Sequence, residues 1–262
     1  MSFPQTFDPS TLSLGAIGAL TGAAFVAGFV DAIAGGGGLI TVPALLAAGL
    51  PTHLALGTNK GQSVFGATAS VVSFARRGSI DRARAAPAFV LALVGAFAGA
   101  AIQLAVPSGP LRPIALGLLV AAAAMVALRP LFLRGERKSP TSPAPLIAGL
   151  IALSLGAYDG FFGPGTGSLL VIAYVTFLGD AMTSASGNAK VANFGSNLAS
   201  VILFAIRGTV LWKISLPMAV GNSIGAAIGV RVALKRGDNF VRVVLLVVVV
   251  ALVMKLGWDL AH

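Results

Sequence analysis

The chain contains no cysteine, and only 10% of its 262 residues are charged. The absence of cysteine excludes disulfides and thiolate metal sites. There are only two histidines, His53 and His262, and they lie far apart, so a histidine metal site is not expected. There is no histidine–glutamate pair, no cluster of metal ligands and no nucleophile beside a base, which argues against an enzyme and against a bound cofactor.

Polar residues are too few to cover a soluble fold of this length. The hydrophobic fraction is 56%, and the charged fraction lies far below the roughly 25% of ordinary globular proteins. Lipid is therefore the expected solvent, and the 33 glycines suit helices that pack closely within it. The net charge of +10 comes largely from basic clusters that flank apolar segments, notably 76–84 and 129–138. Such flanking clusters are typical of the positive-inside rule and not of nucleic-acid binding.

The second half of the chain repeats the first at a nearly constant offset. GFVDAIAGGGG, starting at Gly28, corresponds to GAYDGFFGPGTG, starting at Gly156. ALGTNK, ending at Lys60, corresponds to ASGNAK, ending at Lys190. A duplicated apolar chain with paired polar motifs inside its hydrophobic segments is typical of a two-repeat transporter.

Five apolar segments can be drawn in each half. A helix that crosses a bilayer needs about 20 residues, so the second segment of each half is too short for a full crossing. The segments are 12–34, 36–50, 54–75, 85–106 and 111–133, and then 146–162, 166–179, 184–206, 214–234 and 240–260.

The topology depends on the two short segments. If they cross, each half has five spans and the repeats are inverted; if they are re-entrant, each half has four and the repeats run parallel. Lysine and arginine counts barely separate the two, but the full-length segment after each short one favours crossing. We therefore expect an all-α polytopic membrane protein with about ten transmembrane helices in two inverted repeats. The repeats are 1–133 and 146–262, joined by a cytoplasmic linker at 134–145.

Glycine-rich motifs interrupt each repeat between its first and second segments. Glycine lets the backbone turn sharply, and the helix that follows presents free amides and a positive dipole end to an anion. A turn without a ligand is the simpler interpretation of one such motif, but its recurrence favours a binding site. The candidates are Gly36, Gly37 and Gly38 in the first repeat and Gly165, Thr166 and Gly167 in the second.

Polar residues open the third segment of each repeat. Lys60 and Lys190 are matched cations at possible hydrocarbon depth, where a charge costs on the order of 3 kcal/mol. They either extend to the membrane interface or line a substrate cavity suited to a small oxyanion. The predicted binding residues are Thr58, Asn59, Lys60, Gln62, Asn188, Lys190 and Asn193, within stretches that also hold Ser63, Ser186, Ser196 and Asn197.

Asp31 and Asp159 occupy matched positions, each four residues before a glycine motif. An acid there could carry a proton for coupling. It could equally form a buried ion pair with Lys60 or Lys190, or cap the next helix.

The first of these motifs resembles the TauE/SafE sulfite exporter family. The features are a GxxD step into a glycine-rich turn, followed by LITVPALLAAGLP and ALGTNK, with a diverged second copy. The family motif covers Gly35 to Gly38, Pro43, Gly57, Thr58, Asn59 and Lys60. The resemblance implies movement of small sulfur-containing anions, such as sulfite and organosulfonates, across the bacterial inner membrane.

The expected function is therefore secondary transport, in the direction of export, of a small anion bound between the repeats. No nucleotide-binding motif is present, so the energy would come from a proton or ion gradient or from the substrate's own gradient. A passive anion channel that uses the same residues as a filter is the alternative.

Overall fold

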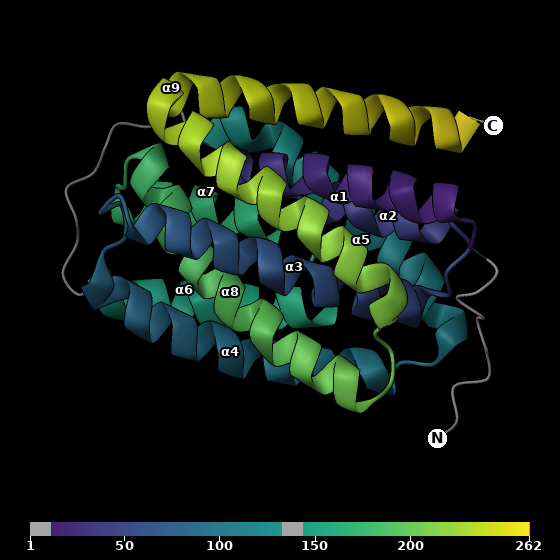
Figure 1. The fold of residues 1–262 in the computed structure, drawn as a ribbon. Helices are drawn as coiled ribbons and strands as arrows, with labels where there is room; N and C mark the ends of the chain where they lie inside the picture. Colours follow the sequence, from purple (N-terminus) through teal and green to yellow (C-terminus); the bar gives the residue numbers. More distant parts are fainter. Residues whose placement is uncertain (1–11, 133–143, 262) are drawn as a thin grey trace.

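Residues 12–132 and 144–261 are described by a computed structural model, and their regular structure is entirely helical (Figure 1). The prediction of an all-α protein is confirmed. Within those ranges the helices are α1 (Leu14–Ala34), α2 (Gly38–Ala47), α3 (Thr52–Ala75), α4 (Arg82–Ala105), α5 (Ser108–Phe132), α6 (Ala144–Phe161), α7 (Thr166–Leu178), α8 (Met182–Ile206) and α9 (Trp212–Ala261).

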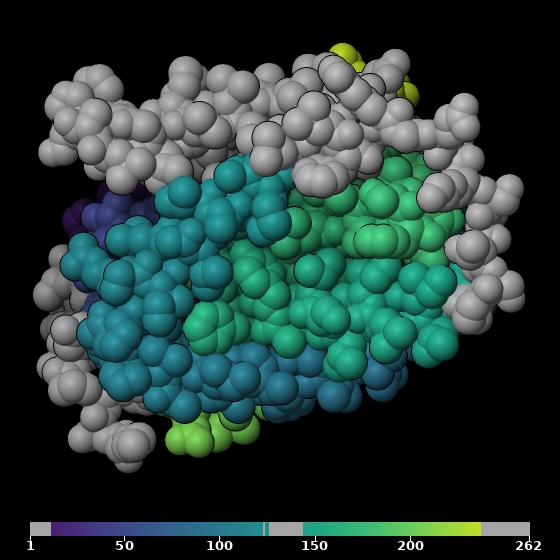
Figure 2. Space-filling model, turned by 180° about the vertical axis from the view of Figure 1, so that it is seen from behind, coloured from purple at the N-terminus to yellow at the C-terminus, as the bar shows by residue number. Residues whose placement is uncertain are grey.

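Five stretches of the described chain are long and apolar enough to cross a membrane: α1, α4, α6, α8 and Trp212–Arg236 of α9. α3 is as long as α4, at 24 residues, but its polar N-terminal half lowers its hydropathy. Large apolar side chains stand on the outside, for example Phe177 at 61% exposure. The face seen in Figure 2 is built largely from the teal and green residues of α4 to α7. A surface of this kind fits lipid, and the chain is a multi-pass membrane protein.

The helices follow the predicted segments closely, with one difference. The short segments become α2, with 10 residues, and α7, with 13, which at 1.5 Å per residue are about 15 and 20 Å long. The predicted segments 214–234 and 240–260 lie in one helical element, α9, and form two arms because the element folds back between them (Figure 1). Figure 1 shows the yellow second part of α9 running back along the bundle. The predicted linker at 134–145 lies almost wholly outside the described residues.

Each half packs its fourth helix against the first helix of the other half. α4 lies on α6 and α9 lies on α1, and glycines let these backbones touch. A Cβ atom at any of these glycines would overlap the facing backbone, which is the role of small residues between helices in lipid. The pairs are Gly95 with Leu153, Gly99 with Ala157, Gly225 with Phe25, and Gly229 with Phe29.

The long central helices α3 and α8 run in opposite directions. Gly57, near the start of α3, lies against Thr209, just after the end of α8. Gly187, near the start of α8, lies against Ser79, just after the end of α3. Because both helices carry a polar stretch in their first half, this packing brings the two stretches toward the centre of the bundle.

Candidate functional site

Two glycine turns introduce the short helices. The turn between α1 and α2 has positive φ at Gly35 (69°) and Gly36 (143°), and the turn between α6 and α7 has positive φ at Gly163 (98°) and Gly165 (87°). A side chain would be strained at each of these positions, so glycine is what allows the chain to reverse here.

The two turns touch each other although they are far apart in the sequence. A Cβ atom at Gly35 would overlap the backbone of Gly167. Ser168, in the first turn of α7, donates a hydrogen bond to the carbonyl oxygen of Ala34 at 2.8 Å. The short helices α2 and α7 therefore both begin at the middle of the bundle.

Each half pairs its lysine with the aspartate of the other half. Lys60 Nζ on α3 lies 2.8 Å from Asp159 Oδ1 on α6. Lys190 Nζ on α8 lies 2.6 Å from Asp31 Oδ2 on α1. The side chains of both lysines and Asp159 are at most 3% exposed, and that of Asp31 is 23% exposed. The lysines therefore do not extend to the interface, and these four side chains together carry no net charge.

The N-terminus of α2 is filled by the protein's own carboxylate. Asp31 Oδ1 accepts hydrogen bonds from the amides of Gly36, at 2.9 Å, and Gly37, at 3.2 Å. Asp31 thus combines two of its predicted roles, ion pairing and capping. It occupies the place at which an anion is expected to meet the positive end of the helix.

The N-terminus of α7 differs from that of α2. Its N-cap residue is Gly165, and among the described residues no side chain caps it. Asp159 turns instead toward α8, where it accepts hydrogen bonds from Ser196 Oγ and, at 3.4 Å, from Asn193 Nδ2. The amide end of α7 therefore faces the centre of the bundle without a carboxylate of its own.

Amide side chains of α3 and α9 complete the polar centre. Asn59 Oδ1 accepts hydrogen bonds from Thr41 Oγ1 at 2.5 Å and from Gln62 Nε2 at 3.0 Å. Gln62 Oε1 in turn accepts one from Asn222 Nδ2 at 2.5 Å. All four side chains are buried, so the network links α2, α3 and α9 beside the ion pairs.

A cavity of about 30 Å³ lies among these groups, which is room for about one water molecule. It is lined by residues from both repeats, so the structure brings most of the predicted site together. The predicted residues that line it are Asp31, Gly36, Gly37, Gly38, Asn59, Lys60, Asp159, Gly165, Thr166, Gly167 and Asn193.

Four predicted residues lie outside the lining of this cavity. Gln62 and Lys190 stand one layer behind it, bonded to Asn59 and Asp31. Thr58 and Asn188 face elsewhere, because each precedes its lysine by two residues, about 200° around the helix.

Thr58 and Asn188 instead tie helices to links of the other half. Thr58 Oγ1 accepts a hydrogen bond from the amide of Leu211 at 3.1 Å, and Asn188 Oδ1 accepts one from the amide of Asp81 at 2.9 Å. The two bonds join matched positions of the two halves, and neither side chain lines the central cavity.

A second ionic cluster surrounds Asn188 at the end of the molecule that carries residues 76–84. Arg84 Nη1 lies 2.7 Å from Asp180 Oδ1, and Arg84 Nε lies 2.7 Å from Asp81 Oδ2. Partial burial opposes ionisation of Asp81, but the hydrogen bond and charge of Arg84 hold its pKa below the usual range. The Arg84–Asp180 pair closes the gap between α4 and the α7–α8 link.

Sequence reasoning missed four residues of the cavity lining. Ser63 and Asn197 belong to the polar stretches and Gly163 to the glycine motif, so the sequence identified their segments but did not assign these residues to the binding site. Asn222 of α9 has no polar counterpart in the first repeat. Its signal is an asparagine between glycines in an apolar segment. It fills the space left by Gly28 and Gly66, where an added Cβ atom would overlap Asn222.

These features define a class: a multi-pass helical membrane protein with ionisable residues buried between its helices, as in transporters. The family profile described as sulfite exporter TauE/SafE matches residues 20–256, and the chain belongs to that family. The predicted resemblance is therefore confirmed.

Similar proteins are named as membrane transporters. The chain is 40% identical over 240 residues to the probable membrane transporter protein ORF9 of Sinorhizobium sp, with 92% of each chain covered. It is 37% identical to a probable membrane transporter protein of Haemophilus influenzae, over 90% of this chain and 92% of the relative. It is 36% identical to the probable membrane transporter protein YfcA of Escherichia coli, over 98% of this chain and 94% of the relative. No solved structure matches. The chain is thus a membrane transporter of the TauE/SafE family.

Proposed function

We propose that this protein is a secondary transporter that exports a small anion, such as sulfite or an organosulfonate, across the bacterial inner membrane. The single observation that carries the proposal is the crossed pairing of Lys60 with Asp159 and of Lys190 with Asp31 beside two glycine turns. Buried charges are costly in a membrane, and four of them gathered in one place favour a function over a purely structural role.

The anion would bind between the amide end of α7 and Lys60. Thr166 and the α7 amides supply hydrogen-bond donors, and Asn59 and Asn193 replace part of the water shell. The present cavity of about 30 Å³ holds one water, so binding requires the surrounding helices to separate. The closed arrangement is then the resting state, in which aspartates take the place of the absent anion.

Proton coupling follows from the charge balance of the site. Two lysines and two aspartates sum to zero, so an anion would bring uncompensated negative charge into a buried cavity. A proton on Asp159 would remove that charge and release Lys60 to the anion. We therefore infer that the anion moves together with a proton, with Asp31 and Asp159 as its carriers, and that the outward gradient of the substrate itself drives this electroneutral export.

We further propose that the chain consists of two inverted repeats, 1–133 and 146–262, joined by a linker at 134–145, with about ten transmembrane segments. The opposite directions of α3 and α8 and the exchanged packing of α4 on α6 and α9 on α1 support this arrangement. Rocking of one repeat against the other would then expose the shared site to alternate sides of the membrane.

Flux measurements in proteoliposomes test the proposal. We expect Lys60→Ala together with Lys190→Ala to abolish sulfite and ethanesulfonate flux, and Asp159→Asn to remove its stimulation by a pH gradient. Arg207→Ala is the matched control, because Arg207 is exposed at the end of α8. Full flux in the double lysine variant would refute the proposed site.

A second measurement separates a carrier from the alternative of a passive channel. A carrier exchanges labelled for unlabelled anion faster than it allows net flow, whereas a channel does not. We expect counterflow of labelled sulfite and saturation of the rate. Thermal shifts with sulfite, sulfate, thiosulfate and small sulfonates would identify the ligand, because selective binding raises the melting temperature.

A further inference from the structure

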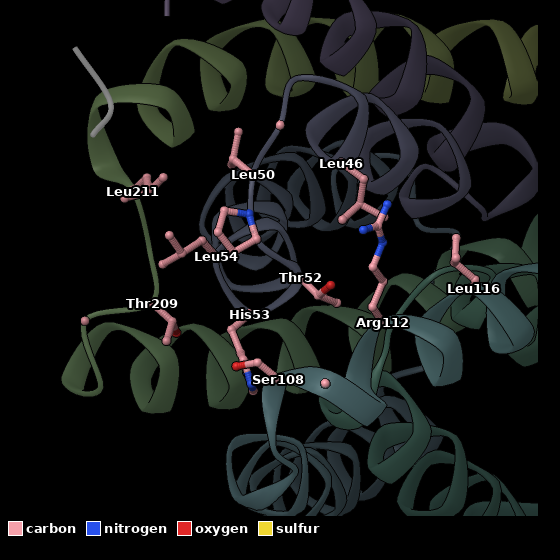
Figure 3. Close-up of a pocket in the computed structure, with 14 residues that line it drawn as sticks. Leu46, Leu50, Thr52, His53, Leu54, Ser108, Arg112, Leu116, Thr209 and Leu211 are labelled. Atoms are coloured by element: carbon pink, nitrogen blue, oxygen red, sulfur yellow. The ribbon is translucent and has the colours of Figure 1, made fainter. Parts of the chain in front are cut away.

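A second cavity lies away from the central site. It has a volume of about 650 Å³ and opens where α2 ends and where α3, α5 and α9 begin (Figure 3). We call it the vestibule. The clusters at 76–84 and around Arg231 lie at the other end of α3, α4 and the first part of α9, so the positive-inside rule places the vestibule on the outward side.

The described lining of the vestibule carries positive charge. Among the residues that the structure describes, Arg112 is the only permanently charged side chain in the lining, and no aspartate or glutamate belongs to it. In Figure 3 the Arg112 side chain extends from α5 toward Leu46, into the cavity. Thr52 and Ser108, which begin α3 and α5, also line it, so two positive helix ends add to the field of Arg112.

Only a thin apolar layer separates the vestibule from the central site. Along α3, Thr52 lines the vestibule and Asn59 lines the central cavity, about 10 Å apart at 1.5 Å per residue. Leu56 lies between them and packs in one buried cluster with Val42 of α2 and with Phe162, the residue directly after α6. α2 shows the same order, since it runs from Gly38 at the central cavity through Val42 to the vestibule.

We propose that the vestibule is a second anion site in which Arg112 holds the transported oxyanion on its way between the central site and the outside. The proposal rests on the proposed function for the class of ligand. The apolar layer of Val42, Leu56 and Phe162 is the barrier that the anion crosses between the two sites. A positive vestibule raises the local anion concentration at this barrier, and Arg112 sets the apparent KM on the outward side.

Thiol labelling tests the vestibule directly, because the chain has no cysteine and each variant carries a single thiol. Gly109 lines the vestibule, and a Cβ atom there meets nothing within 4 Å, so Gly109→Cys fits without strain. The matched control is Leu14→Cys, at 88% exposure near the start of α1 and outside the vestibule lining. The readout is the ratio of labelling rates for a sulfonate-bearing and a trimethylammonium-bearing methanethiosulfonate reagent.

We expect this ratio to be higher at Gly109→Cys than at Leu14→Cys. Arg112→Gln should lower this ratio of labelling rates about tenfold at low salt. The reason is that one positive charge about 6 Å away attracts the sulfonate reagent and repels the trimethylammonium reagent. Ethanesulfonate should slow labelling of Gly109→Cys, and ethyltrimethylammonium should not. An unchanged ratio in Arg112→Gln, or no protection by ethanesulfonate, would overturn the proposal.

Transport measured on the same variants keeps the two proposals apart. Arg112→Gln should raise the KM for anion presented on the vestibule side several-fold and leave kcat unchanged, whereas Arg207→Gln should change neither. A lowered kcat with unchanged KM would exclude the vestibule as a binding site. The labelling ratio does not depend on transport, so loss of flux in the Lys60 variants with a normal ratio tests the central site alone.

Discussion

The buried pair of Lys60 and Asp159 allows a quantitative prediction about stability. Their charged atoms are 2.8 Å apart, and the side chains are 3% and 2% exposed. At an effective dielectric constant of about 20 this distance corresponds to an attraction of about 6 kcal/mol, which desolvation of both charges opposes. Removing one partner leaves the other buried without a countercharge.

We therefore expect Lys60→Met and Asp159→Asn each to lower the free energy of unfolding by about 3–5 kcal/mol. The double variant should lose no more than either single one, because neither charge is left alone. The coupling energy in the cycle should then be at least about 3 kcal/mol, whereas independent sites add within about 0.5 kcal/mol.

The assay is thermal unfolding in detergent, with Arg207→Gln as the exposed control. For a chain of this size, each kcal/mol shifts the melting temperature by about 2–4 °C, so each single variant should melt roughly 6–20 °C lower. The double variant should recover part of that loss. If the effects of the two substitutions simply add, the pair is not an energetic unit and the reasoning fails.

Three further predictions concern the ionic cluster and the helix contacts. Arg84→Gln breaks the ion pair with Asp180. A thiol placed in the central cavity should then be labelled faster by a reagent added on the side of the basic clusters, and an unchanged labelling rate would show that the ion pair does not close this side. Because the folded-state pKa of Asp81 is depressed, this cluster contributes stability above about pH 4 and loses it as the pH falls through the folded value, so the melting temperature of Arg84→Gln and of the unmodified protein should converge in acid. Gly99→Ala should destabilise by about 1–3 kcal/mol or more, because its Cβ overlaps the α6 backbone. Gly117→Ala, with open space at its Cβ, should be neutral or stabilising by up to about 1 kcal/mol, and equal effects at the two glycines would contradict the packing.

The helices could be predicted from sequence because apolar length is a local property. Segments 184–206 and 85–106 became α8 and α4 with boundaries shifted by only a few residues. The polar run KRGDN predicts that the chain turns between segments 214–234 and 240–260, and Figure 1 shows such a turn, but the sequence did not predict that helical structure continues through it.

The sequence repeat predicts most residues of the central site, but it does not predict which lysine pairs with which aspartate. Matched positions identify Lys60, Lys190, Asp31 and Asp159 as a set, whereas the partner of each depends on helix packing that no local pattern contains. The spacing along each helix does predict that Thr58 and Asn188 face away from the lysines, because each of them precedes its lysine by two residues. Asn222 breaks the repeat, so symmetry could not reveal it.

The vestibule was beyond sequence reasoning for a different reason. Its lining combines the end of α2 with the starts of α3, α5 and α9, which are segments far apart in the chain. Arg112 alone is one of several basic residues near a segment end, and only the cavity around it distinguishes it from the others.

The exchange of partners between the halves has a consequence for assembly. Either half expressed by itself would carry a buried amine and a buried acid whose partners are on the missing half. Neither half is thus a self-sufficient folding unit, and each should be degraded or aggregate unless the other is co-expressed with it. A substitution at one of these charged residues should therefore destabilise the other half, in which its partner is left without a countercharge.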